Sequence, residues 1–273
     1  MFEPYLSRWR LTADGAPIVT PRAHLVPVRR DGEAAMLKVA TEPEEKHGGL
    51  LMAWWDGQGA ARVLAMDDDA ILLERAQGTR SLSTYAREGR DEEATLVLCD
   101  AIAALHAPRA KPLPALIPLI VWFEALAPAA ATHGGVLARC SAIAQDLLAT
   151  PQEVGALHGD IHHDNVLDFE ARGWLVIDPK RLLGERGFDY ANLFCNPESA
   201  GAGAQGGTQA ALVVAHFDRR LELVTERSGL DRRRLLQWIA AWCGLSAAWW
   251  MGDGVTPEVD LRVAELALAA LDG

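Results

Sequence analysis

The chain has 273 residues, half of them hydrophobic, which is enough to build one large domain or two lobes that share a core. It carries 26 Lys and Arg residues against 37 Asp and Glu residues, so its net charge is −11. This charge disfavours a nucleic-acid or anionic-membrane partner, because both require a basic face. It suits a cationic ligand, although acidity that serves solubility alone is the more ordinary explanation.

The sequence shows no sign of targeting or of metal-binding cysteine pairs. The N-terminus lacks a basic stretch followed by an apolar one, and no uncharged apolar run reaches membrane-spanning length. We therefore expect a cytoplasmic protein. The cysteines lie far apart and form no Cys-x-x-Cys pair, so free buried thiols are expected rather than a zinc cage. They are Cys99, Cys140, Cys195 and Cys243.

The first forty residues are predicted to form short strands, because Asp14-Gly15 and Asp31-Gly32 are turn dipeptides between apolar runs. The second dipeptide predicts a hairpin of residues 24–28 and 34–39. On the outgoing strand, alternation places Lys38 on one face with small and apolar neighbours. Lys38 is then either an edge lysine in water or the strand lysine that holds the α- and β-phosphates of ATP.

The segment after this strand favours the second interpretation of Lys38. Thr41-Glu-Pro-Glu44 has the form of a capping box, with Thr41 as the N-cap of a helix and Glu44 reaching back to it. Glu45 is then freer to turn inward and pair with Lys38, which is the arrangement found in kinases. The choice of Glu45 over Glu44 rests on this capping argument alone.

A second hairpin is predicted for residues 62–66 and 70–73, around an acidic triplet at residues 67–69 that we interpret as a solvated turn. Its last strand leads into a short linker whose backbone can bond to a flat heterocycle. We predict that the carbonyl of Glu74 and the amide of Ala76 make these contacts to the nucleotide. The change from strands to helices divides the chain into a nucleotide-binding lobe, residues 1–75, and a catalytic and substrate-binding lobe, residues 76–273.

The second lobe is predicted to be mostly helical. Helices are expected at residues 81–87, 91–107, 119–126, 136–148, 209–227, 231–251 and 257–271. Thr256 is expected to cap the last of these, with Pro257 at its first helical position. The glycine- and alanine-rich residues 201–207 lack the Gly-Lys-Ser/Thr ending of a phosphate-binding loop, so we interpret them as a linker.

Residues suited to phosphoryl transfer lie near the middle of the chain. In His158-Gly-Asp160, Asp160 can accept the proton of a substrate hydroxyl, and His158 is expected to support the loop by hydrogen bonds. A hairpin of residues 166–169 and 174–177 would place Asn165 before its first strand and Asp178 after its second, at the same end. Both side chains offer oxygen ligands to Mg²⁺.

Two features near this motif have simpler explanations. His162, His163 and Asp164 could form a metal triad, but adjacent residues make poor ligand geometry. Asp189 could cap the helix that begins near Phe188, or it could reach back to the loop that carries Asp160. Either role of Asp189 is structural.

These motifs resemble the aminoglycoside phosphotransferase superfamily, which is related to protein kinases. Within it the chain looks most like the streptomycin 6-kinase group, also named for hydroxyurea phosphotransferase. The resemblance implies a bilobal α+β fold, with a small antiparallel sheet lobe containing one helix and a larger, mostly helical lobe. It also implies ATP and Mg²⁺ as cofactors and O-phosphorylation of an aminoglycoside hydroxyl. It is carried by His158-Gly-Asp160, Asn165, Asp178-Pro-Lys180 and Phe188-Asp-Tyr-Ala191, and by echoes at residues 35–38, 51–57, 72–76 and 192–197.

Three departures from protein kinases favour a small-molecule acceptor. No Gly-x-Gly-x-x-Gly stands near the N-terminus, so phosphate cover is expected from the turn at Asp14-Gly15. Asp178-Pro-Lys180 replaces Asp-Phe-Gly, and no activation-loop signature follows. The main prediction is a streptomycin 6-kinase with a cationic aminoglycoside as acceptor. The alternatives are a kinase-like enzyme acting on a sugar, a choline-like compound or an amino alcohol, and a catalytically silent binding module.

The sequence does not rank the residues that would contact the acceptor, and it does not indicate an oligomeric state. Four acidic residues of the second lobe are candidates for the acceptor site. They are Glu124, Glu185, Glu198 and Asp253.

Overall fold

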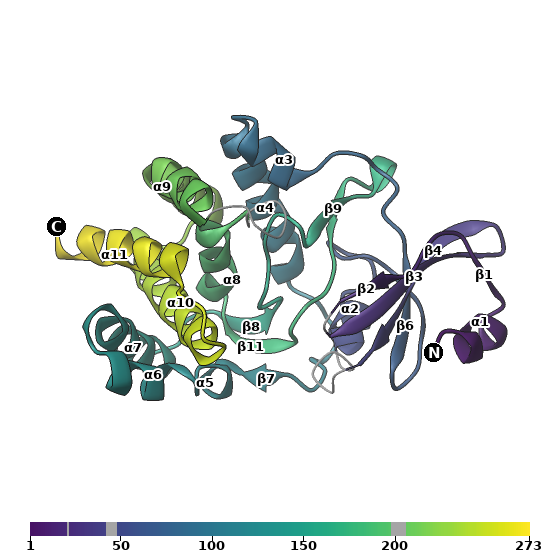
Figure 1. Ribbon diagram of the computed structural model, residues 1–273, viewed down its shortest axis with the longest axis horizontal. Helices are drawn as coiled ribbons and strands as arrows, with labels where there is room; N and C mark the ends of the chain where they lie inside the picture. Colours follow the sequence, from purple (N-terminus) through teal and green to yellow (C-terminus); the bar gives the residue numbers. More distant parts are fainter. Residues whose placement is uncertain (21, 42–47, 198–205) are drawn as a thin grey trace.

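The computed structural model describes residues 1–20, 22–41, 48–197 and 206–273, and the chain forms two lobes (Figure 1). A small lobe built on an antiparallel sheet holds the N-terminus. A larger lobe, mostly helical, holds the C-terminus at the opposite end of the molecule. The predicted two-lobed α+β architecture is confirmed, while the predicted boundary near residue 75 remains a prediction.

The sheet of the small lobe has the strand order β1-β3-β4-β6-β5, with β2 also paired to β3. Both predicted hairpins are present in it. The strands are β1 (Leu11–Ala13), β2 (Ile18–Val19), β3 (Ala23–Arg30), β4 (Glu33–Ala40), β5 (Val63–Met66) and β6 (Ala70–Glu74).

Lys38 lies on a central strand of this sheet. It pairs with Leu25 of β3 on one side and with Ile71 of β6 on the other. Its side chain is 13% exposed. The alternative of an edge lysine in water is therefore wrong.

Alternation along the strands gives the small lobe its own core, because every second side chain points to the same face. On β4 the buried residues are Ala35, Leu37 and Val39, which pack with Val28 and Leu72 from the neighbouring strands. Aromatic and aliphatic side chains of helix α1 (Glu3–Arg8) cover this core. Helix α1 was not among the predicted elements, although a proline in its first turn is a helix-start signal.

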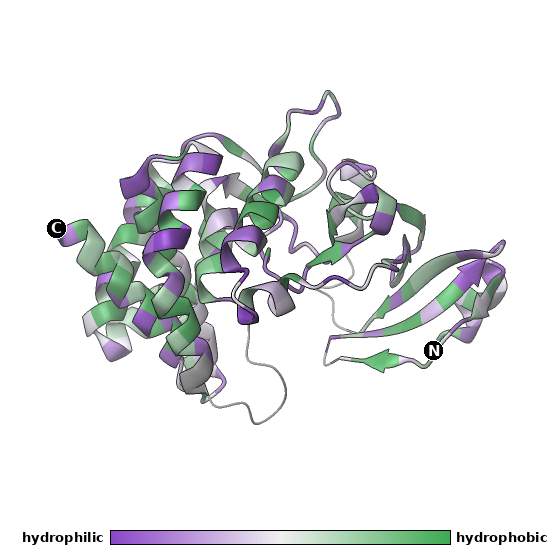
Figure 2. Cartoon of the chain, turned by 90° about the horizontal axis from the view of Figure 1, so that it is seen from above, coloured by the Kyte–Doolittle hydropathy of each residue, from purple (hydrophilic) through white to green (hydrophobic). Residues whose placement is uncertain are grey.

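The large lobe surrounds a single extended core. Its helices show polar and apolar residues on the same element, as expected for helices with one buried side (Figure 2). They are α3 (Leu82–Arg87), α4 (Asp91–His106), α5 (Leu119–Trp122), α6 (Leu126–His133), α7 (Gly135–Ala149), α8 (Gly187–Ala191), α9 (Gly206–Ser228), α10 (Arg232–Gly252) and α11 (Glu258–Asp272).

Two small sheets lie within the large lobe, beside the sheet lobe. One is the hairpin of β9 (Val166–Asp168) and β10 (Trp174–Val176). The other has the order β7-β11-β8, from β7 (Ile117–Pro118), β11 (Leu182–Glu185) and β8 (Val154–Leu157). Helix α2 (Gly48–Trp55) follows the strand of Lys38 in the sequence, but its buried Leu51, Met52 and Trp55 pack into the core of the large lobe.

Two details of the predicted helices are wrong. Residues 119–126 do not form one helix, because α5 ends at Trp122 and α6 begins at Leu126, with Pro128 in its first turn. Thr256 does not cap the last helix with its side chain. Its backbone carbonyl accepts from the amide of Glu258 instead, and α11 begins at Glu258.

Other predictions have mixed outcomes. All four cysteines are buried and free, as expected. Within the described ranges, no helix has the length and apolar character needed to cross a membrane. The helix start at residues 42–47, with Glu44 and Glu45, lies outside the described residues, and so does most of the predicted linker at residues 201–207.

Candidate active site

The site is built around the tight loop that follows strand β8. The backbone amides of His158 and Gly159 both donate to the carboxylate of Asp189, at 2.9 and 2.8 Å. Gly159 has a φ of +84°, and a Cβ at this position would lie 2.7 Å from a side-chain carbon of Leu182. Only glycine suits this turn, which explains its place between His158 and Asp160.

His158 is a structural member of this loop, as predicted. It is fully buried, its Nε2 lies 2.8 Å from the carbonyl of Ile177, and its Nδ1 accepts from the amide of Asp160 at 3.2 Å. The ring stacks against Trp55 of α2 with centroids 6.2 Å apart. Burial lowers the pKa of His158, so the ring is held neutral.

The buried carboxylate of Asp189 holds the loop of residues 158–160 in shape. Besides the two loop amides, it lies 2.8 Å from Nε2 of His106. Burial works to raise the pKa of Asp189, but the hydrogen bonds and the neighbouring His106 outweigh it and keep the pKa below its ordinary value. Asp189 does not cap helix α8, whose N-cap is Arg186. The prediction that Asp189 reaches back to the loop of Asp160 is confirmed.

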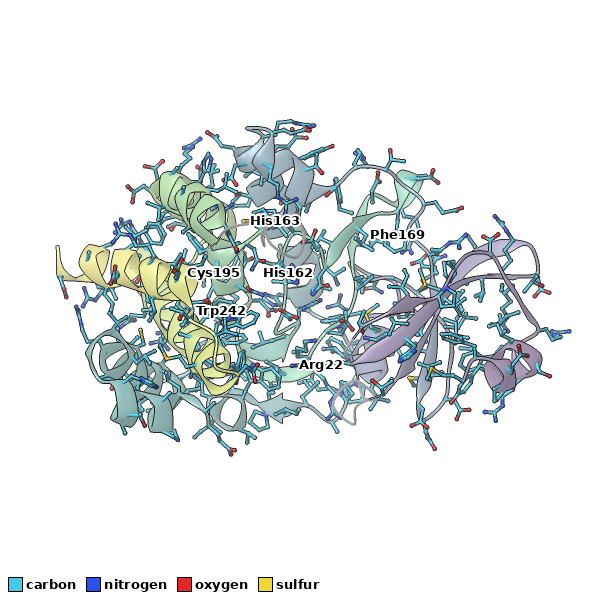
Figure 3. The ribbon with its side chains drawn as sticks, in the orientation of Figure 1. Arg22, His162, His163, Phe169, Cys195 and Trp242 are labelled. Atoms are coloured by element: carbon cyan, nitrogen blue, oxygen red, sulfur yellow. The ribbon has the colours of Figure 1, made fainter. Side chains whose placement is uncertain are left out.

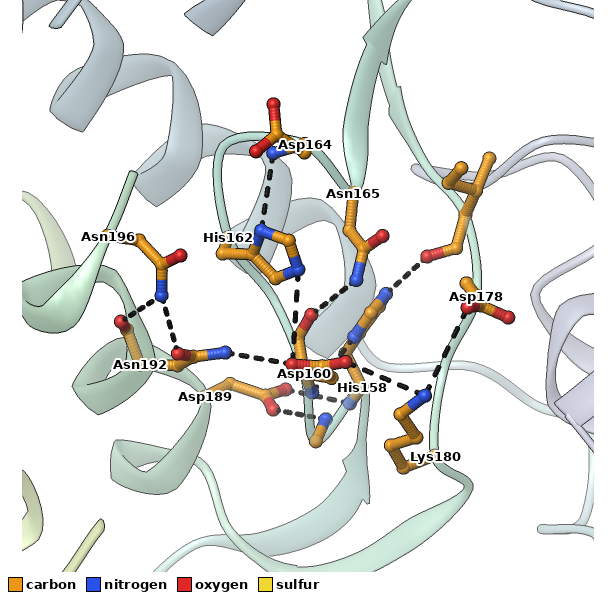
Figure 4. Close-up of polar contacts among 12 residues, drawn as sticks. His158, Asp160, His162, Asp164, Asn165, Asp178, Lys180, Asp189, Asn192 and Asn196 are labelled. Atoms are coloured by element: carbon orange, nitrogen blue, oxygen red, sulfur yellow. Dashed lines mark hydrogen bonds and ion pairs between the residues drawn. The ribbon is translucent and has the colours of Figure 1, made fainter. Parts of the chain in front are cut away.

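Asp160 projects from this loop and its side chain is 34% exposed. The side-chain amide of Asn192 donates to its Oδ1 at 3.1 Å (Figure 4). Asn196 fixes the orientation of that amide, because its Nδ2 donates to Oδ1 of Asn192 at 2.9 Å. Lys180 Nζ lies 3.5 Å from the other oxygen of Asp160. The contacts of Asn192 and Lys180 with Asp160 were not predicted, since only the tertiary fold brings these residues together.

Asn165 and Asp178 lie at the same end of the β9–β10 hairpin, as predicted. Val166 pairs with Val176, and the amide of Ile177 donates to the carbonyl of Asn165 at 2.9 Å. The side-chain nitrogen of Asn165 donates to the carbonyl of Asp160 at 2.8 Å, which leaves its oxygen available as a ligand. Asp178 has a φ of +62°, an uncommon backbone conformation that is concentrated at functional sites.

These two side chains fit a Mg²⁺ ion. Carboxylate and amide oxygens are the ligands it prefers, and it commonly binds through one or two protein groups together with substrate phosphates. Among the described residues no group of three His, Cys, Asp or Glu side chains gathers as a metal site.

Lys38 reaches across from the sheet and forms an ion pair with Asp178. This contact brings together two of the residues singled out in the sequence, one from each lobe. Partial burial works to raise the pKa of Asp178, but the charges of Lys38 and Lys180 keep it below its ordinary value. The predicted partner of Lys38, Glu45, lies outside the described residues.

The two predicted nucleotide contacts lie where β6 leads into the linker between the lobes, with Glu74 as the last residue of the strand and Ala76 in the linker. The side chain of Glu74 pairs with Arg172 and accepts from the amide of Arg62 at 2.6 Å, so it is engaged within the protein. Ala76 is half-buried and packs against the core of the large lobe. The expected contacts of the Glu74 carbonyl and the Ala76 amide with a nucleotide remain predictions.

Asp168 on β9 is hydrogen-bonded to the same linker. Arg80 donates two side-chain hydrogen bonds to its carboxylate, at 2.7 and 2.8 Å. The amide of Gly78 donates to its carbonyl at 3.0 Å. Its pKa is lowered to about 2, mainly by the hydrogen bond from Arg80. The hairpin that ends in Asn165 and Asp178 is thus joined to the segment between the lobes.

The adjacent histidines do not form a metal triad with Asp164. His162 Nδ1 accepts from the amide of Asp164, while the carboxylate of Asp164 accepts from Ser83 at 2.5 Å. His163 is 1% exposed and turns into the protein. Figure 3 shows both histidines near the middle of the molecule. His162 and Asp164 thus bond to different groups, and His163 is buried away from both.

A buried arginine supports the segment that carries Asn192. Arg220 of α9 is fully buried and donates to both oxygens of Asp91, at 2.5 and 3.0 Å. It also donates to the carbonyls of Leu193 and Asn196, at 2.8 and 2.7 Å. Arg220 therefore fixes the position of the short helix of residues 192–195, and this helix holds Asn192 against Asp160.

One of the four acidic candidates for acceptor binding is excluded. Glu185 is 2% exposed and pairs with Arg234, and it also accepts from the indole N–H of Trp238 at 2.7 Å. Its carboxylate is committed to the interior, where an acceptor could not reach it. Glu124 and Asp253 are exposed, and Glu198 lies outside the described residues.

Comparison with known proteins agrees with this geometry. The family model of the aminoglycoside/hydroxyurea antibiotic resistance kinases matches residues 8–254. The streptomycin 3″-kinase of Klebsiella pneumoniae is 48% identical over 98% of this chain and 100% of its own length. The streptomycin 6-kinase of Streptomyces griseus is 32% identical over 95% of this chain and 85% of its own length. The predicted resemblance is confirmed.

Solved structures share the fold. A choline/ethanolamine kinase family protein from Mesorhizobium loti superposes with a TM-score of 0.64 at 15% identity, covering 98% of this chain and 90% of the other. A mutant of the aminoglycoside phosphotransferase APH(4)-Ia, in complex with AMP-PNP and hygromycin B, gives 0.62 at 14% identity, with coverages of 99% and 96%. The predicted kinase-like fold is confirmed.

Proposed function

The chain belongs to the aminoglycoside/hydroxyurea antibiotic resistance kinase family, and we propose that it transfers the γ-phosphoryl group of ATP to a hydroxyl of streptomycin. The observation that carries this proposal is the meeting of Asp160, Asn165, Asp178 and Lys38 at one place between the lobes. Identity to a streptomycin kinase over the full chain supports the choice of acceptor.

We place the phosphoryl group on the 3″-hydroxyl of streptomycin. The resemblance described above favoured the streptomycin 6-kinase group and left open which hydroxyl is phosphorylated. The relative named for the 3″ position is 48% identical, whereas the two named for the 6 position are 32% and 33% identical. The higher identity supports the 3″ assignment.

The described side chains suit this reaction. Asp160 is partly exposed, and Asn192 holds one of its oxygens, so the other can accept the proton of the attacking hydroxyl. Lys38 would contact the phosphates of ATP and leave its ion pair with Asp178. The oxygens of Asn165 and Asp178 would hold Mg²⁺, which neutralises charge on those phosphates.

The test incubates the purified protein with ATP, MgCl₂ and streptomycin and measures ADP release. Fragment masses and NMR of the product then identify the phosphorylated ring, since the 6- and 3″-hydroxyls lie on different rings. We expect phosphate at 3″ and no turnover after EDTA treatment. Phosphate at position 6 would contradict the regiochemistry. Turnover of another alcohol but not of streptomycin would contradict the acceptor.

Asp160→Ala tests the proposed base. Loss of the proton acceptor should lower kcat by about three orders of magnitude, because general-base catalysis contributes about 10²–10⁴-fold. The Kd for ADP should change less than about twofold, since Asp160 is assigned to the acceptor side. The matched control is Asp146→Ala, which removes an exposed aspartate of α7. An unchanged kcat in Asp160→Ala would remove Asp160 as the base.

A further inference from the structure

Lys180 lies between the proposed base and a proposed metal ligand. Its Nζ is 3.5 Å from Oδ2 of Asp160 and 4.0 Å from Oδ2 of Asp178 (Figure 4). Its backbone amide donates to the carbonyl of His158 at 2.7 Å, which fixes the start of the side chain against the loop of Asp160. The side chain is 19% exposed. The ammonium group of Lys180 therefore lies between Asp160, the proposed base for the acceptor, and Asp178, a proposed ligand of the nucleotide-bound Mg²⁺.

The distances do not suit a role limited to holding these carboxylates. Charge-assisted hydrogen bonds between ammonium and carboxylate groups are about 2.7–2.9 Å long. Lys180 Nζ stands farther than this from both of these carboxylates. Each carboxylate also has a nearer partner, since Asp160 accepts from Asn192 and Asp178 pairs with Lys38.

We propose that Lys180 is a catalytic residue that binds the γ-phosphoryl group while it passes from ATP to the acceptor. This inference rests on the proposed function, because it assigns Asp178 to the nucleotide side and Asp160 to the acceptor side. A phosphoryl group that travels between these sides passes the ammonium group that lies near both. Negative charge is spread over the equatorial oxygens during transfer, and a fixed cation stabilises it there.

The reaction balances with these residues. The bond between the γ-phosphorus and the oxygen that links it to the β-phosphate breaks, and ADP leaves with the electron pair. A bond forms between the acceptor oxygen and the γ-phosphorus, and the acceptor proton passes to Asp160. Lys180 keeps its three protons throughout and contributes charge and hydrogen bonds.

The test compares two neutral variants, Lys180→Met and Lys180→Gln, with Lys180→Arg, which keeps the charge. Calorimetry with MgCl₂ measures the Kd of ADP and of AMP-PNP for each variant without any acceptor. The neutral variants should bind AMP-PNP at least about tenfold more weakly, because only the triphosphate analogue presents a γ-phosphoryl group. Their Kd for ADP should stay within about twofold of wild type. Lys180→Arg should keep most of the preference for AMP-PNP.

Kinetics complete the test. With a saturating acceptor, kcat of the neutral variants should fall by about 10²–10³-fold, the usual effect of removing one group that stabilises the transition state. KM for the acceptor should change little. Lys111→Met is the matched control, since Lys111 is exposed and pairs with Asp56 on the surface. Its kcat and both nucleotide affinities should equal those of wild type.

The outcomes separate this inference from the proposed function. Equal weakening of ADP and AMP-PNP binding, or an unchanged kcat, would overturn the assignment of Lys180 and leave the proposed function standing. If the wild type phosphorylates a different alcohol, that alcohol serves as the acceptor in the same comparison. If the wild type binds neither nucleotide, the proposed function fails and the assignment of Lys180 fails with it.

Discussion

Asp189→Asn tests whether the shape of the loop that carries Asp160 depends on one buried carboxylate. Asp189 is 1% exposed and faces three groups within 2.9 Å. Two are the backbone amides of His158 and Gly159, and the third is a ring nitrogen of His106. Asparagine has nearly the same shape, but one of its terminal atoms is a donor. At that atom a donor would face a donor, because the backbone amides cannot reverse their role.

The magnitude follows from these contacts. If the asparagine oxygen takes the place of Oδ2, the contacts with His158 and His106 survive, and the amide of Gly159 is left without an acceptor. Each surviving bond loses its charge assistance, at a cost of about 1 kcal/mol, and the unpaired buried amide costs about 1–3 kcal/mol. The free energy of unfolding should therefore fall by about 3–5 kcal/mol. In the opposite orientation the amide of His158 is the one left without an acceptor, while the ring of His106 can change tautomer and accept from the asparagine, so the cost is similar.

Urea unfolding with a fixed slope measures this loss. The control is Asp272→Asn, which makes the same chemical change in an exposed ion pair with Arg139 and should cost less than about 1 kcal/mol. In the folded variant, kcat should fall by about 100-fold, because a displaced loop misplaces Asp160. A stability within 1 kcal/mol of the control would refute the energetic argument. An unchanged kcat would show that catalysis does not need this loop shape.

Two further predictions concern buried charges. Arg220→Met should lower the free energy of unfolding by about 3–5 kcal/mol, because it leaves Asp91 buried without the guanidinium that donates to both of its oxygens. The double variant with Asp91→Leu should regain part of this loss in urea unfolding, and simple addition of the two single losses would argue against the pair. The pKa of Asp168 falls from 3.8 to about 2 on folding, so its ionised form favours the folded state above about pH 4. The melting temperature of Asp168→Asn should therefore lie below that of wild type by a constant amount from pH 7 to about pH 5. This difference should shrink as the pH falls from about 4 towards 2, and a difference that grows in acid would contradict the argument.

The local pattern was enough to predict the parts of the site that lie close together in the sequence. Turn dipeptides and alternation predicted the hairpins, and the β9–β10 hairpin brings Asn165 and Asp178 to one end. Alternation also placed Lys38 on the correct face of its strand. These features depend on interactions between neighbouring residues, which the sequence displays directly.

The parts that were missed depend on contacts between distant segments. Arg220 and Asp91 stand 129 positions apart, and Asn192 and Asp160 stand 32 apart. No periodicity links such pairs. Glu185 was one of four unranked acidic candidates for acceptor binding, and the structure places it inside the protein, where Arg234 neutralises it. The break between α5 and α6 had a local signal in Pro128, because proline is tolerated in the first turn of a helix.

The hydrogen bonds of Asp168 join the β9–β10 hairpin to the linker between the lobes, so ordering of one is coupled to ordering of the other. Gly78 and Arg80 are hydrogen-bonded to Asp168 of β9. Asn165 precedes β9, and Asp178 follows its partner strand β10. Thermodynamic linkage is reciprocal, so a ligand that orders the linker through this hairpin is bound more tightly by the same free energy when the linker is already ordered. A substitution in the linker, far from Asn165 and Asp178, would then change the affinity of the hairpin end for its ligands.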